Sequence, residues 1–303
     1  MAATRGAFSQ LLAPGLFSVI YEDLEMHPEE YSQIFNVYPS EQEYEEDQLI
    51  AGLGAVPVKP EGTSLALDEP IQGGSIRFVH ISYGLGFQVT REMWDDDKYG
   101  IMRRVSQDFA GSIRQTVEST FAGVLINGFT GGTTKTIDGV LLFQNTATGG
   151  HPLLGGGTYN NRSSTDIAFS VTGLQELTLL FEKMVNERGL LKRTMPEFVL
   201  GPPDIQFKMG EILHSAYAPY TGTNEVNVMQ GRFTPIVNHY LTNPTQWFML
   251  AAKRGHTLKG YWRTQPQFDS QDDFMTKGAS FSVFFRFSAG VTYWHGVCAS
   301  NGA

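Results

Sequence analysis

The sequence predicts an α+β fold, because apolar side chains recur with two different periods in adjacent parts of the chain. In residues 79–90 they occupy every second position, which is the repeat of a strand with one buried face. In residues 101–124 they recur mostly every fourth position, which places them along one side of a helix. Two apolar segments, Ser280–Arg286 and Gly290–Cys298, predict an antiparallel strand pair at the end of the chain.

The first fifty residues are acidic. They contain ten acidic residues and a single base, Arg5, so they account for the whole formal net charge of −9. No basic stripe stands elsewhere, which argues against strong binding to phosphate groups. Two explanations of the acidic segment stay open: it repels nearby DNA, or it is a solvated stretch that keeps the free chain soluble.

Residues 1–45 are expected to form an N-terminal arm, with one short helix near residues 28–35. Apolar side chains are frequent in the arm, but they follow no sustained period and are interrupted by Pro14, Gly15 and Pro28. Such a segment cannot bury these side chains alone, so it needs a surface of its own domain or of a neighbour.

Residues 46–92 predict a long β-hairpin. The alternating segment 79–89 is its expected return strand, the outgoing half near 49–59 is broken by Gly and Pro, and the tip near 60–70 is polar. A two-stranded ribbon is only marginally stable in water, so we expect it to lie on another surface.

A long helix is predicted over residues 95–127. Asp95, Asp96 and Asp97 offer an N-cap and favourable negative charge, and Asn127–Gly128 supplies a stop signal. Residues 128–169 predict loops and turns over a small sheet. Further elements are expected as a strand at 139–143, helices at 170–188 and about 202–215, and strands at 196–201, 235–241 and 247–253.

No cofactor, metal or catalytic site is predicted. The glycine-rich segment 128–136 lacks the order of a P-loop and follows a helix, where that motif needs a preceding strand. The seven histidines are scattered, and the single cysteine, Cys298, excludes an intrachain disulfide. No apolar run reaches the length of a membrane span, so we expect a chain made in a reducing cytoplasm.

Five segments, in this order, resemble the major capsid proteins of tailed phages, whose fold is shared with herpesvirus shells and encapsulins, and in particular the Mu-type major head subunits. They are VTREMWDDDKYG (Val89–Gly100), DGVLLFQNTATGGHPLLGGGTYNN (Asp138–Asn161), ERGLLKRTMPEFVLGPPD (Glu187–Asp204), VNHYLTNPTQWFMLA (Val237–Ala251) and the aromatic end near Trp294–Gly302.

This resemblance implies a domain organisation. Residues 1–45 look like the N-terminal arm and 46–92 like the extended E-loop hairpin. Residues 93–168 and 266–303 look like the peripheral P-domain, with 95–127 as its spine helix, and 169–265 look like the axial A-domain. We expect contacts between copies at Phe8, Leu11, Leu12, Phe17 and Tyr21 of the arm, and at Val56, Val58, Leu65, Leu67, Ile71 and Phe78 of the hairpin.

The resemblance also implies partners and a location. It implies hexamers and pentamers of the chain in the icosahedral capsid of a virion, assembled in the host cytoplasm around double-stranded DNA without sequence-specific binding. It further implies a separate scaffolding protein and a portal, and it leaves open whether a cement protein is present. Three alternatives stay open: an encapsulin-like compartment with enzyme cargo, an enzyme with an unrecognised site in 169–265, or another structural part of the virion.

Overall fold

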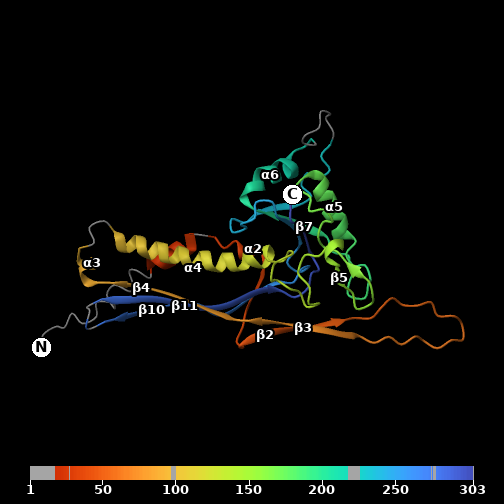
Figure 1. The fold of residues 1–303 in the computed structure, drawn as a ribbon, viewed down its shortest axis with the longest axis horizontal. Coiled ribbons are helices and arrows are strands. Elements are labelled where there is room, and N and C mark those ends of the chain that lie inside the picture. Colours follow the sequence, from red (N-terminus) through yellow and green to blue (C-terminus); the bar gives the residue numbers. More distant parts are fainter. Residues whose placement is uncertain are drawn as a thin grey trace.

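The computed structural model describes residues 18–26, 28–96, 100–217, 226–273, 275 and 278–302. Three parts are visible in Figure 1: an elongated base of long strands under one long helix, a more compact part with two shorter helices, and a projecting hairpin. The mixture of helices and sheets confirms the predicted α+β class.

A four-stranded sheet forms the base. Its strands β1 (Asn36–Pro39), β10 (Leu258–Asp272), β11 (Ala279–Val291) and β4 (Ile81–Val89) lie in that order. Only β1 and β10 are parallel, and the other neighbours are antiparallel. Helix α4 (Ile101–Ile126) lies along this sheet (Figure 1), and its buried side chains join those of β11 in one core.

The compact part is built on a second four-stranded sheet. Its order is β12 (Val297–Ser300), β9 (Trp247–Ala251), β7 (Pro196–Gly201) and β8 (Thr234–Val237). All residues of the central strand β9 are buried, so they read as a continuous apolar run rather than an alternating one. Two helices complete this part, α5 (Val171–Glu182) and α6 (Gln206–His214), the second preceded by the short turn η2 (Pro203–Ile205).

The hairpin consists of β2 (Tyr44–Ala51) and β3 (Ile71–Val79), which pair in antiparallel fashion and are joined by a long loop at the far end. Residues 18–26 are helical. The remaining short elements are α2 (Tyr31–Ile34), α3 (Arg91–Asp95), η1 (Thr146–Thr148), β5 (His151–Pro152) and β6 (Thr158–Tyr159).

Two predictions near the hairpin were wrong, one in the partner of a strand and one in the start of a helix. The alternating segment 79–89 is not the return strand, because β4 pairs with β11 in the base sheet, and β3 returns instead. The long helix begins at Ile101 rather than at residue 95. Gly100 precedes it in the left-handed conformation (φ 67°), and Asp95 ends the separate helix α3.

The predicted C-terminal strand pair was also wrong. Strand β11 runs unbroken through 280–291 and pairs with β10 and β4, whereas β12 pairs with β9 in the other sheet. Strands β10 and β1 were not predicted, and the proposed boundary at residue 265 falls inside β10. Residues 139–143 form no strand; Leu141 makes only an isolated bridge with Lys135.

The predictions for the middle of the chain were closer. Strand 196–201 matches β7 at both ends, and the proline-initiated helix matches η2 and α6. The side chain of Ser170 accepts a hydrogen bond from the amide of Gly173 and caps α5, but this helix ends at Glu182 and not near 188. The segment beyond it forms a turn in which Gly189 has a positive φ.

Candidate assembly surfaces

The loop at the hairpin end (52–70, here the tip) carries four aliphatic side chains that are at least 73% exposed, and a fifth, Leu53, that is 58% exposed. Val56 is 95% exposed, Val58 92%, Leu65 73% and Leu67 95%. All four belong to the predicted contact set. This loop lies at the end of a projecting ribbon (Figure 1), and several large exposed apolar side chains on one loop are typical of an interaction site, whereas single ones are common on any surface.

An ion pair attaches the base of the tip to the turn after α5. The guanidinium of Arg188 donates to both carboxylate oxygens of Asp68 at 2.7 Å, and the amide of Gly54 donates to the same carboxylate at 2.7 Å. The Gly54 hydrogen bond first, and then Arg188, hold the pKa of Asp68 below its ordinary value. The outgoing and returning segments of the loop are thus tied to each other and to the compact part.

The other two predicted hairpin contacts lie differently. Ile71 is half-buried at the start of β3. Phe78 is 5% exposed within a single chain, because its ring fills the space left by Gly290 and lies 5.4 Å from the ring of Tyr261. A Cβ at Gly290 would stand 2.6 Å from that ring. Phe78 therefore packs in the core of the single chain, and its predicted part in a contact between copies stays a prediction.

The described part of the arm is folded on its own chain. Ile20, Ile34 and Phe35 are almost fully buried in the main core. Tyr21 is half exposed, and its ring meets that of Phe268 edge to face at 5.2 Å. Ile20, Ile34 and Phe35 thus find their partner surface within the chain. The predicted contacts Phe8, Leu11, Leu12 and Phe17 lie outside the described residues.

A carboxylate of the long helix holds this part of the arm in place. Glu118, only 1% exposed, accepts hydrogen bonds from the amides of Glu30 (2.9 Å) and Tyr31 (3.0 Å), which lie at the free N-terminus of α2. Arg114, one turn away, donates to Glu29 and to the carbonyl of Leu24. Burial raises the pKa of Glu118 to about 7 despite the two hydrogen bonds.

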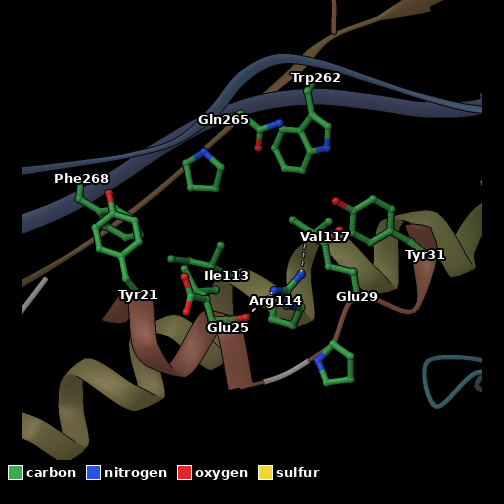
Figure 2. Close-up of a pocket in the computed structure, with 13 residues that line it drawn as sticks. Tyr21, Glu25, Glu29, Tyr31, Ile113, Arg114, Val117, Trp262, Gln265 and Phe268 are labelled. Carbon is green, nitrogen blue, oxygen red and sulfur yellow. Dashed lines mark hydrogen bonds and ion pairs between the residues drawn. The ribbon is translucent and has the colours of Figure 1, made fainter. Parts of the chain in front are cut away.

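A cavity of about 510 Å³ lies between the arm, the long helix and β10. Figure 2 shows Tyr21 and Tyr31 from the arm, Ile113 and Arg114 from α4, and Trp262 and Phe268 from β10 around it. Its walls are mostly aromatic and aliphatic. The Nε atom of Arg114 is buried there and finds no hydrogen-bond partner among the described residues.

A buried histidine joins the loop segment 128–169 to the end of the chain. The Nδ1 of His151 lies 2.6 Å from Asp138, its Nε2 lies 3.1 Å from the carbonyl oxygen of Leu142, and its ring stacks on Trp294 at 4.9 Å. Both ring nitrogens lie close to oxygen acceptors. These contacts join two segments of the core.

Within the described ranges, no group of three or more His, Cys, Asp or Glu side chains is placed to hold a metal ion. No helix in those ranges is long and apolar enough to cross a membrane.

A sequence profile described as phage capsid protein matches residues 76–300, about three quarters of the chain. None of the curated proteins matches the chain significantly.

Among solved structures, the chain is similar to a protein of Mycobacterium phage Adephagia, with a TM-score of 0.61, 10% identity and 91% of each chain covered. It is also similar to the capsid of an empty GTA particle (TM-score 0.59, 11% identity, covering 91% of this chain and 90% of the other). A third similar structure is the procapsid of bacteriophage JBD30 (TM-score 0.52, 14% identity, covering 97% and 75%). At these identities the likeness concerns the fold.

Proposed function

Because the chain belongs to the phage capsid protein family and is a structural major capsid protein, we propose that its hairpin tip is a principal contact between neighbouring copies in the shell. The proposal rests on one observation: Val56, Val58, Leu65 and Leu67 are 73–95% exposed in the single chain. Full burial of one such side chain contributes roughly 1.5–3 kcal/mol. Four of them can stabilise a contact that is repeated around a shell, where many modest contacts act together.

The arrangement of the parts supports the domain roles that the resemblance implies. The base sheet with α4 would form the peripheral P-domain, the compact part with α5 and α6 would form the A-domain around the five-fold and six-fold centres, and the hairpin would form the E-loop. Pentamers and hexamers of this kind would enclose double-stranded DNA in the virion, after assembly in the host cytoplasm. The even balance of charge beyond residue 50 suits a container without sequence-specific DNA binding.

We further propose that a separate scaffolding protein, a portal and a cement protein complete the particle. The family match favours this phage head over the encapsulin-like compartment. Nuclease-protected DNA in particles from producing cells is expected for a phage head, whereas a protein cargo would favour the compartment.

The role of the tip is tested by removing its apolar character in the full-length chain. Changing Val56, Val58, Leu65 and Leu67 together to Ser should leave the chain folded, because none of these side chains belongs to the core, but should reduce the yield of shells at least tenfold. Circular dichroism reports folding, and electron microscopy with sedimentation velocity reports assembly. Deleting residues 59–70 should have the same effect.

The matched control changes the two valines to Ile and the two leucines to Met. This variant keeps the tip apolar and should assemble like the unmodified chain. Normal shells from the serine variant, or equal loss in both variants, would show that the tip is not an assembly contact.

A further inference from the structure

Strand β4 forms an open edge of the base sheet. It follows β11 at the end of the order β1-β10-β11-β4, and among the described residues its backbone makes no hydrogen bonds beyond its ladder with β11. Soluble proteins usually protect such an edge with charged residues, proline or a bulge. The nine residues Ile81–Val89 contain no charge and no proline, and their ladder with β11 has no register shift. An edge of this kind is suited to pair with another strand.

The sequence of this strand is nearly symmetric about its centre. Leu85 is flanked by Gly84 and Gly86, and the residues further out match in kind: Tyr83 with Phe87, Ser82 with Gln88, and Ile81 with Val89. An antiparallel pair of identical strands related by a two-fold axis places each of these residues opposite its match. A strand whose two halves match in this way is therefore complementary to itself.

We propose that two copies of the chain pair through β4, edge to edge and antiparallel, around a two-fold axis that passes through Leu85. The two base sheets would then form one sheet of eight strands across the copies. On one face, Tyr83 would stand opposite Phe87 of the second copy, an aromatic cross-strand pair, and the two Leu85 side chains would meet at the axis. On the other face, the glycines would allow close approach.

The exposure of the strand agrees with this arrangement. Ile81 is 56% exposed and Leu85 49% exposed, and both lie on the same face of the sheet as the buried Phe285, so they are incompletely covered within one chain. Pairing would cover them and would satisfy the free backbone groups of the edge. The inference rests on the self-assembly of the family but not on the hairpin tip, because the two surfaces share no residues.

Cysteine cross-linking tests the register directly. In Leu85→Cys, the two new thiols would stand opposite each other with Cβ atoms about 5 Å apart, so mild oxidation should give a covalent dimer in high yield. The native Cys298 is fully buried and should contribute little background. In the control Gln88→Cys, also exposed, the register would hold the two thiols about 20 Å apart, and cross-linking should be at least tenfold lower. Equal cross-linking of the two variants, or none with Leu85→Cys, would overturn the proposal.

Charge at the axis gives a second test, because a residue on a two-fold axis lies opposite the same residue of the second copy. Leu85→Lys and Leu85→Glu should each lower the fraction of paired chains at least tenfold, and mixing the two variants should restore pairing by placing opposite charges together. No recovery on mixing would contradict the register. Combining Leu85→Cys with the tip serine substitutions separates the two proposals: the dimer should still form where shells are lost.

Discussion

Glu118 is a buried carboxylate whose protonation affects the attachment of the arm. Around it lie Glu29 and Glu30 on the arm, Arg114 on its own helix, and Tyr240 on the loop after β8. Loss of water raises the pKa of Glu118, and the charge of Glu30 adds to this, while the two arm amides and Arg114 oppose it. Desolvation has the larger effect on this pKa, because one cation and two amides cannot replace the water lost by a side chain that is 1% exposed.

This shift predicts a pH dependence of stability. The pKa of Glu118 is about 7 in the folded chain and near its ordinary 4.5 when unfolded, so between these values the folded state binds more protons. The contribution of Glu118 is therefore fully present below pH 4.5 and is lost as pH rises through 7. We expect the free energy of unfolding to fall by roughly 2 kcal/mol across this window relative to Glu118→Gln, which cannot titrate. Urea unfolding of both chains at pH 5, 6 and 7.5 measures the difference, and parallel curves would contradict it.

Burial has the opposite effect on two histidines. It lowers the pKa of His256 to about 4 and that of His295 to about 3. Their neutral forms stabilise the fold above the ordinary histidine pKa, and this contribution is lost as pH falls through the lowered values. The comparison with Glu118→Gln isolates the carboxylate, because both chains keep these histidines.

At the scale of elements, the packing of α4 against the base sheet depends on a glycine. The ring of Phe121, at the contact, stacks on Tyr31 at 4.3 Å and on Phe287 at 5.7 Å. Gly260 of β10 leaves room for this ring, since a Cβ at that position would lie 2.5 Å from it. The helix, the arm and the sheet thus meet at one aromatic cluster that tolerates no added volume.

Gly260→Ala should therefore destabilise the chain by about 1–3 kcal/mol, because Phe121 must move within a packed core. The control is Gly111→Ala in α4, where a Cβ meets nothing within 4 Å. There the higher helix propensity of Ala should stabilise the chain by about 0.5–1 kcal/mol. Chemical denaturation of both variants measures these changes, and a neutral Gly260→Ala would show that the contact can relax.

The sequence revealed elements whose signal is local, and failed where partners are distant. The apolar repeats of β4 and α4 could be recognised in the sequence, and so could the proline that precedes α6. Strand β10 was missed because Pro266 and two register shifts interrupt its pattern. The partner of β4 could not be read, since an alternating pattern shows that one face is buried but not which strand lies beside it.

The same limit applies to the assembly surfaces. The predicted tip residues are exposed in the structure, and their part in assembly stays a prediction. The burial of Phe78 in its own chain could not be predicted, because the space that accepts its ring is created by Gly290, more than two hundred residues later in the chain. Recognising the open edge of β4 required the strand order, which the residue pattern alone does not reveal.

At the scale of the whole molecule, the direction of the hairpin matters more for assembly than for folding. The ribbon projects well beyond the body of the chain (Figure 1). The ion pair between Arg188 and Asp68 attaches its tip to the compact part. Without this pair the tip would sample more directions, and ordering it on a neighbour would cost more conformational entropy. Asp68, the carboxylate of this pair, is 43% exposed, and solvent screening at that side limits what the pair contributes to folding itself.

We therefore expect Arg188→Gln and Asp68→Asn to unfold at nearly the same temperature as the unmodified chain but to assemble several-fold more slowly. Light scattering during assembly measures the rate, and differential scanning calorimetry measures unfolding. Because both substitutions remove the same contact, the double variant should assemble no more slowly than either single one. Additive slowing would mean that the two residues act through separate contacts, and unchanged rates in both single variants would show that the hairpin is held in its direction by the pairing of β2 with β3 alone.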